Sequence, residues 1–376
     1  MEKQVEYFGN GSIKKLEEVL SNLKSERIFL VTGKNSFKES GAEKELESIF
    51  QGKNVFQFSD FKSNPNIIDV KKGIEEFKKF APDIVVAVGG GSVIDMAKLV
   101  NMLSFQVGDL EDYIKGEKKL TTNGLPLVAI PTTSGSGSEA THFAVVYIDT
   151  TKYSLADQKI LPTISIVDPL LTSNLNAEIT AQAGADALCQ AIESLWSVAS
   201  TKESKEYARE ALSLLYPNLK DVVLKPDQKL REIIAKGSHL AGKAINLSKT
   251  TACHALSYPF TSHFNIPHGQ AVSLTLPQIL IYNSEVNEEN NNDPRGVSYV
   301  KQTIDEIIEI LGTKTPKEAS ETLDELFNAI GLKVNFDKLK PVNIDLILKE
   351  ASIERMKNNP RNMTLADARL ILNTII

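Results

Sequence analysis

The sequence has few cysteines and no long apolar segment. Only two of its 376 residues are cysteines, Cys189 and Cys253, and both fall in segments with helical periodicity. A disulfide framework is therefore not expected, and a reducing compartment fits. No window approaches ~18 uninterrupted apolar residues, and the N-terminal segment lacks the apolar core of a secretory signal. We therefore expect a cytoplasmic protein without a membrane span.

The sequence also lacks the charge pattern of a nucleic-acid-binding protein. Its formal net charge is −6, from 42 lysines and arginines against 48 aspartates and glutamates. The lysines are scattered among glutamates rather than clustered. Internal repeats, coiled-coil heptads and low-complexity tracts are absent. The hydrophobic content of 42% suffices for a sizeable core, and the length favours two domains over one.

The first half alternates short apolar runs with helical periodicity. The runs of strand type lie at 27–33, 54–60, 83–91 and 126–133. Residues 83–91 form a continuous apolar run, as expected of a strand buried on both faces of a parallel sheet. This order predicts an α/β fold with a doubly wound parallel sheet.

The second half is predicted to be helical. Strand character persists over 153–171, and the pattern becomes almost wholly helical after about residue 176. Helices are expected at 178–199, 203–217, 228–247, 250–264, 298–311, 316–330 and 343–355. We place the domain boundary near 172–178, which predicts an α/β dinucleotide-binding domain over 1–175 and an all-α metal-binding and substrate domain over 176–376.

A glycine-rich turn follows the third buried strand. Gly89, Gly90, Gly91 and Ser92 end this strand and open a helix. Backbone N–H groups and the helix dipole at such a point favour an anion such as a pyrophosphate. Asp95, in the first turn of the helix, could bond a sugar or amide of a cofactor. The GxGxxG fingerprint is absent, so a tight turn without a ligand is the alternative.

A second turn, PTTSGSGSE at 131–139, is rich in small hydroxyl residues and glycines. It follows a buried strand directly, at the sheet edge where ligands bind. Its alternative is a flexible surface loop. The candidate cofactor contacts here are Thr132, Thr133 and Ser136, and Lys152 is a further candidate.

Four residues of the second half could hold one divalent cation. Asp186 and Gln190 lie one helical turn apart on the same face. His254 lies on an apolar helical segment, and His268 lies in a Pro-His-Gly turn. Their N and O atoms suit a borderline cation. Each residue alone is more often a cap, a core residue or a turn residue. Their joint appearance after a nucleotide-type domain favours a metal-assisted dehydrogenase.

These motifs together resemble the iron-containing (group III) alcohol dehydrogenases over essentially the full chain. The resemblance rests on GGGSVID, PTTSGSGSE, VDPLLT, GADAL and the spacing from His254 to the Pro-His-Gly turn. It implies a dehydroquinate synthase-like dinucleotide domain, a helical domain, and bound Fe²⁺ or Zn²⁺. The family's four metal ligands, one Asp and three His, fall on Asp186, Gln190, His254 and His268, and the two histidines are expected to be catalytic.

Two positions depart from the family's pattern. Gln190 stands where the family has histidine, and an amide oxygen is a poorer ligand than imidazole. The site could therefore be weaker, or hold its metal through three protein ligands. Tyr258 replaces a further histidine four residues after the third ligand. It could act as a catalytic proton relay or only fill space.

The segment SYPFTSHFNIPHG resembles the phosphonoacetaldehyde reductase branch of the family. This resemblance implies reduction of phosphonoacetaldehyde to 2-hydroxyethylphosphonate. Thr261, Ser262 and His263 could supply donors for an anionic head group. The alternatives are a broad NADPH-dependent aldehyde reductase, a metal-dead binding paralogue and a cyclising lyase of the dehydroquinate synthase kind, although PTTSGSGSE and the Pro-His-Gly turn argue against the lyase.

The cofactor is predicted from the turn after the first strand. NAD-using relatives carry an acidic residue there for the ribose 2′-OH, whereas this chain has Gly33 followed by Lys34. Lys34 could pair with a 2′-phosphate. NADPH is therefore favoured, with NADH as the alternative. The expected partners are a small aldehyde or alcohol, with a phosphonate as one candidate, and a second copy of the chain in a homodimer.

Overall fold

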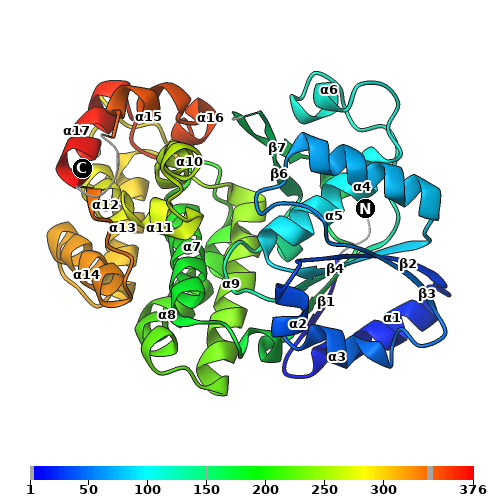
Figure 1. The fold of residues 1–376 in the computed structure, drawn as a ribbon. Helices are drawn as coiled ribbons and strands as arrows, with labels where there is room; N and C mark the ends of the chain where they lie inside the picture. The colour runs from blue at the N-terminus through cyan, green and yellow to red at the C-terminus, as the bar shows by residue number, and fades with distance from the viewer. Residues whose placement is uncertain (1–3, 150, 337–341) are drawn as a thin grey trace. The chain divides into compact units, whose positions relative to one another are not determined.

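The computed structural model describes residues 4–149, 151–336 and 342–376 and divides into two compact units (Figure 1). The first comprises Met1–Leu175 and Asp227–Ala235, and the second comprises Asn176–Pro226 and Lys236–Ile376.

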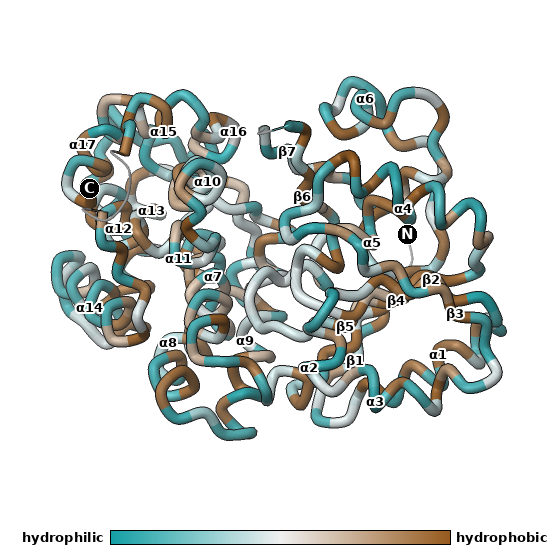
Figure 2. The backbone as a smooth tube through the Cα atoms, viewed as in Figure 1, coloured by the Kyte–Doolittle hydropathy of each residue, from teal (hydrophilic) through white to brown (hydrophobic). Residues whose placement is uncertain are grey.

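The first unit is built on a six-stranded parallel sheet, which confirms the predicted α/β class. The strand order is β1-β8-β5-β4-β2-β3. These strands are β1 (Val5–Phe8), β2 (Arg27–Thr32), β3 (Asn54–Phe58), β4 (Ile84–Gly89), β5 (Leu127–Pro131) and β8 (Ile164–Val167). All six residues of β4 and all five of β5 are buried, and both strands carry hydrophobic colours in Figure 2. Burial on both faces explains their unbroken apolar runs.

Helices cover both faces of this sheet (Figure 1). One apolar cluster joins the sheet to the helices α4 and α5, and a second joins its other face to α1 and α3. The helices of this unit are α1 (Lys15–Asn22), α2 (Ser36–Glu39), α3 (Ala42–Glu47), α4 (Ile67–Phe80), α5 (Gly91–Leu103) and α6 (Leu110–Ile114). An antiparallel hairpin is formed by β6 (Phe143–Ile148) and β7 (Thr151–Ala156). The region of predicted strand character over 153–171 contains most of β7 and all of β8.

The strand order places three predicted turns at one edge of the sheet. From β2 the chain continues to β3, its neighbour on one side, whereas from β4 it continues to β5, its neighbour on the opposite side. Thr32 of β2 pairs with Val88 of β4, and Gly89 pairs with Pro131 of β5. The turns that follow these strands therefore meet at the carboxyl edge, where the order reverses and α/β sheets bind ligands.

The elements that the structure describes in the second unit are helical. They are α7 (Ala177–Trp196), α8 (Lys202–Leu224), α10 (Ala252–Phe264), α11 (His268–Ser273), α12 (Leu276–Ser284), α13 (Val297–Ile310), α14 (Pro316–Ala329), α15 (Ile344–Glu350), α16 (Ile353–Met356) and α17 (Leu365–Ile375). Helix α9 (Gln228–Ser248) begins in the first unit and ends in the second. Among the described residues, no helix combines the length and the apolar character needed to cross a bilayer.

Several helix boundaries differ from the sequence-based expectations. The expected end of α8 at residue 217 is wrong, because the helix continues through Pro217 to Leu224. Leu215 and Leu219 are fully buried on either side of this proline, and their packing outweighs its local cost. The helix expected over 343–355 is interrupted at Ala351, and the short helices α11, α12 and α17 were not predicted.

Candidate metal centre and nucleotide-binding edge

Helix α7 carries the two metal-ligand candidates that are closest in sequence. Asn176 caps its N-terminus by accepting a hydrogen bond from the backbone N–H of Ile179, at 2.8 Å. The helix is buried along most of its length, so Asp186 is 6% exposed and Gln190 is 3% exposed. Gln190 makes a side-chain hydrogen bond with Asp186. A carboxylate buried this deeply requires partners that satisfy its charge.

Two histidines from other helices meet Asp186. His254 comes from α10, and His268 is the first residue of α11. Potential ligand atoms of Asp186, His254 and His268 all lie within 4.8 Å of one another. The Nε2 atom of His254 is 3.3 Å from Asp186 Oδ1. The two imidazole rings lie 5.5 Å apart at 73°. One carboxylate and two imidazoles in this arrangement fit a divalent cation such as Fe²⁺ or Zn²⁺.

Gly269 allows α11 to approach α7 closely. A Cβ atom at this position would lie 1.9 Å from the backbone oxygen of Gln182 and 3.2 Å from the Cβ of Asp186. Only glycine therefore fits between the two helices. This close approach brings His268, the preceding residue, beside Asp186, and it gives the Pro-His-Gly turn a structural reason.

Glu193 is a site residue that the sequence analysis did not identify. Its Oε1 atom accepts hydrogen bonds from the Thr251 hydroxyl at 2.7 Å and from the Cys253 N–H at 2.9 Å. Its Oε2 atom contacts Nδ1 of His254. With its proton on Nδ1, His254 would present the Nε2 electron pair to a cation shared with Asp186, which is the arrangement of a histidine ligand held by a carboxylate. Glu193 follows Asp186 by seven residues on one helix, and this spacing could have identified it.

The charges of this cluster favour ionised carboxylates. Burial by itself would raise the pKa of Asp186, but the hydrogen bond from His254 and the charge of His268 outweigh burial and lower it. Burial likewise opposes ionisation of Glu193, and His254 with Thr251 brings its pKa below the usual value. The pKa of His254 is raised, because Glu193 and Asp186 outweigh the effect of burial.

The glycine turn after β4 lies against the hydroxyl-rich turn after β5. A Cβ at Gly91 would meet the Ser136 hydroxyl at 2.5 Å, and one at Gly90 would meet Thr133 Oγ1 at 3.3 Å. The backbone N–H of Thr132 donates to the Gly89 carbonyl at 3.0 Å. Helix α5 begins at Gly91, so its N-terminal amides open beside both turns. Such a cradle of backbone N–H groups suits a phosphate.

The remaining candidates on this edge already have protein partners. Ser92 Oγ accepts from the N–H of Asn64 at 3.2 Å. The Asp95 carboxylate accepts from Ser138 Oγ at 2.5 Å and from Val145 N–H at 3.0 Å, so it ties α5 to the hydroxyl-rich turn and to β6. Lys152 lies on β7, and its charge acts on Asp95.

Comparisons with known proteins match both halves of the chain. Residues 4–169 match the family model of iron-containing alcohol dehydrogenases, and residues 180–376 match the C-terminal model of Fe-containing alcohol dehydrogenases. The chain belongs to the iron-containing alcohol dehydrogenase family. The predicted family and the predicted class of enzyme, an oxidoreductase, are thereby confirmed.

Individual relatives of this dehydrogenase act on different substrates. It is 32% identical to phosphonoacetaldehyde reductase of Streptomyces viridochromogenes over 77% of this chain and 75% of the relative. It is 34% identical to 1,3-propanediol dehydrogenase of Citrobacter freundii over 77% and 76%. The fold is similar to that of sulfoacetaldehyde reductase from Bifidobacterium kashiwanohense, whose structure was solved in complex with NAD⁺. The two structures superpose with a TM-score of 0.88 over 100% of this chain and 97% of the neighbour, at 28% sequence identity.

Tyr258 lies beside a candidate metal ligand. The Tyr258 ring lies 6.0 Å from the His268 ring at 30°. His263, on the same helix, makes a hydrogen bond with the Glu350 carboxylate, with 2.6 Å between Nε2 and Oε2. Thr261 Oγ1 lies 3.5 Å from the Ser257 carbonyl oxygen, to which it donates.

Lys34 lies beside a carboxylate from the loop that follows β3. Its Nζ atom is 3.0 Å from Asp60 Oδ1, and Lys72 contacts the same carboxylate. Hydrogen bonds from the two lysines lower the pKa of Asp60 to about 2. An acidic group therefore does lie near the end of β2, although position 33 is glycine, and the charges of Asp69 and Glu76 also act on Lys72.

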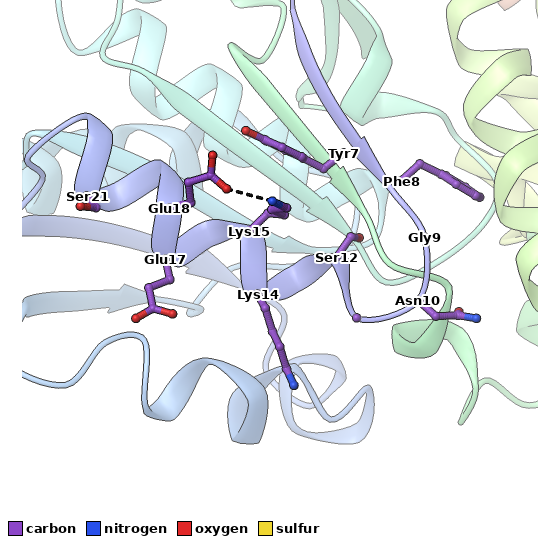
Figure 3. Close-up of a pocket in the computed structure, with 11 residues that line it drawn as sticks. Tyr7, Phe8, Gly9, Asn10, Ser12, Lys14, Lys15, Glu17, Glu18 and Ser21 are labelled. Carbon is purple, nitrogen blue, oxygen red and sulfur yellow. Dashed lines mark hydrogen bonds and ion pairs between the residues drawn. The ribbon is translucent and has the colours of Figure 1, made fainter.

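A surface pocket beside the edge strand β1 contains none of the predicted site residues (Figure 3). Its volume is about 740 Å³, and it is lined by residues of β1, of α1 and of the segment between them. Lys15 lies 5.7 Å from the centre of the Tyr7 ring and pairs with Glu18 at 2.9 Å. We assign this pocket no role in catalysis.

Proposed function

We propose that this dehydrogenase reduces small aldehydes with hydride from NADPH at a divalent metal. Asp186, His254 and His268 would hold the metal, with Gln190 as the fourth candidate ligand. The observation that carries the proposal is the gathering of these three ligand groups within 4.8 Å. A cation bound there would act as a Lewis acid on the substrate carbonyl, and the nicotinamide would supply the hydride.

The chain's own residues have separate tasks in this proposal. Glu193 holds Nδ1 of His254 and so orients the imidazole. Tyr258, beside His268, is the candidate for proton transfer to the product oxygen, and a role in packing alone is the alternative. We assign dinucleotide binding to 1–175 and metal and substrate binding to 176–376.

The cofactor contacts are proposed on the carboxyl edge of the sheet. Backbone groups of Gly89, Gly90 and Gly91 would bind the pyrophosphate, and Thr132, Thr133, Ser136, Ser92, Asp95 and Lys152 would complete the surroundings. Lys34, which follows Gly33, would pair with the 2′-phosphate of NADPH and so supports this cofactor. Asp60 also offers NADH a carboxylate for the ribose, so NADH is the second candidate. The family neighbour described in complex with NAD⁺ supports a nicotinamide cofactor of either kind.

Phosphonoacetaldehyde is the proposed substrate. One relative is named for this aldehyde and one structural neighbour for sulfoacetaldehyde, and both compounds carry an oxyanion next to a two-carbon aldehyde. A broad reductase of neutral aldehydes is the second candidate, supported by the 34% identity to a 1,3-propanediol dehydrogenase. We also propose a homodimer, because the edge strand β1 exposes Val5 and Phe8.

The test combines metal analysis with an aldehyde panel. Purified protein is loaded anaerobically with Fe²⁺ or Zn²⁺, its metal content is measured, and NADPH and NADH oxidation is followed with phosphonoacetaldehyde and butyraldehyde. Light scattering reports the oligomeric state. His254→Ala and His268→Ala should each lose bound metal and activity, whereas Gln190→His should hold metal more tightly against a chelator. Full activity of either alanine variant in metal-free buffer would contradict the proposed centre.

A further inference from the structure

We propose that Arg355 binds the anionic end group of the substrate and makes this dehydrogenase selective for short aldehydes with a terminal oxyanion. This inference rests on the proposed function and specifies its substrate class. The relevant chemistry is a tetrahedral oxyanion, such as phosphonate or sulfonate, at the end of a two- or three-carbon aldehyde.

The position of Arg355 next to the candidate metal centre is the first support. Its guanidinium carbon lies 5.8 Å from the centre of the Tyr258 ring, and the centre of the same ring lies 6.0 Å from that of His268. One aromatic ring thus separates the guanidinium from a candidate metal ligand. A substrate whose carbonyl lies on the His268 side of Tyr258 would need to extend only a few bonds past the ring to reach Arg355.

The charge of Arg355 is available for a ligand. Its Nη1 atom donates to the Thr250 hydroxyl, a neutral group. Among the ion pairs of the described residues, none involves Arg355, although Glu350 on the preceding helix pairs with His263. The planar fork of a guanidinium matches the oxygens of phosphonate or sulfonate and can bind two of them at once.

Pro259 fixes the segment that carries Arg355. A proline inside a helix has no N–H for the carbonyl four residues earlier, which here is Ala255. The backbone N–H of Ser352 donates to this Ala255 carbonyl at 3.3 Å. The proline that follows Tyr258 therefore creates an acceptor on α10, and the chain docks there just before α16. This hydrogen bond also explains why the helix expected over 343–355 is interrupted.

A second anchor holds the other end of the segment. The Asn358 amide donates to the Ser248 carbonyl at 2.9 Å and to the Thr250 carbonyl at 3.0 Å. Thr250 precedes Thr251, whose hydroxyl bonds Glu193 of the metal centre. Arg355 thus lies on a short segment held at both ends against the elements that build the centre. Fixing this segment before binding reduces the entropy lost when an anion binds to Arg355.

The substitution Arg355→Met tests whether Arg355 binds the anionic group, and Lys357→Met is its control. Lys357→Met removes one positive charge from the same segment, at an exposed side chain. In the metal-loaded enzyme with saturating NADPH, we expect Arg355→Met to lower kcat/KM for phosphonoacetaldehyde by about 10- to 100-fold. Its kcat/KM for butyraldehyde should change less than about threefold, and Lys357→Met should leave both unchanged. Arg355→Lys should fall between the parent and Arg355→Met for the anionic aldehyde.

A binding measurement keeps this inference separate from the proposed reaction. Calorimetric titration with ethylphosphonate, which has no carbonyl, should show binding to the metal-loaded, cofactor-saturated parent and to Lys357→Met, and a tenfold or greater loss in Arg355→Met. If the parent binds ethylphosphonate and Arg355→Met does not, but the parent reduces no aldehyde, the proposed reaction is wrong and the assignment of Arg355 as an anion site is supported. Parallel losses for both aldehydes, or equal ethylphosphonate affinity in the parent and Arg355→Met, would overturn the assignment of Arg355.

Discussion

Replacing Gly269 with alanine should displace His268, a candidate metal ligand, although His268 itself is unchanged. The added Cβ would lie 1.9 Å from the Gln182 carbonyl oxygen, whereas ordinary contact begins at 3.4 Å. Helices α11 and α7 must therefore separate by about 1.5 Å, because neither backbone can give way locally. Metal–ligand distances tolerate only about 0.2 Å. His268, adjacent to the substitution, would then no longer reach a cation shared with Asp186.

The expected result is loss of metal together with loss of turnover. A misplacement of about 1 Å can cost on the order of 10²-fold in rate, and overpacking should cost about 1–3 kcal/mol of stability. The measurements are metal content after gel filtration, kcat/KM for the aldehyde and thermal unfolding.

Gly184→Ala is the matched control for this substitution. It adds the same methyl group on α7, but the nearest atoms to its Cβ belong to the Leu219 side chain, with Cδ1 at 2.3 Å, and a side-chain end can move where a backbone cannot. We expect this variant to keep its metal. Parental metal content and kcat/KM in Gly269→Ala would refute the close packing of α11 on α7 as the device that places His268.

Three further substitutions test other parts of the structure. Glu193→Gln should weaken metal binding about 10- to 100-fold, because the amide holds the Nδ1 proton of His254 less firmly; competition with a chelator measures this affinity. Lys98 is 1% exposed, and burial lowers its pKa to about 8 from 10.5. Between these values the unfolded chain binds more protons, so stability should rise from pH 8 to pH 10.5 by up to about 3 kcal/mol, and denaturant titrations of Lys98→Met should lack this rise. Asp60→Asn should shift the ratio of kcat/KM values about two- to fivefold toward NADPH, because Lys34 loses its carboxylate partner; an unchanged ratio would remove this cluster from cofactor choice.

Local sequence patterns determined the elements whose burial is uniform or strictly periodic. The apolar runs at 83–91 and 126–133 correspond to β4 and β5, because a strand covered on both faces needs apolar residues at every position. The spacing of Asp186 and Gln190 also predicted their placement correctly, because a regular helix brings residues four apart to the same face. The motifs of the two turns, of α7 and of the Pro-His-Gly turn were likewise sufficient to identify the family from the sequence.

Contacts between distant segments were decided only by the tertiary structure. Glu193 belongs to the metal centre because α10 places His254 against it, sixty-one residues further along the chain. Pro259 leaves the Ala255 carbonyl without a helical donor, and Ser352 donates to this carbonyl instead. The break before α16 and the position of Arg355 both depend on this hydrogen bond. No periodicity within residues 343–355 contains this information. A local pattern specifies the face that a helix buries, whereas the partner that occupies this face is selected by packing and hydrogen bonding across the fold.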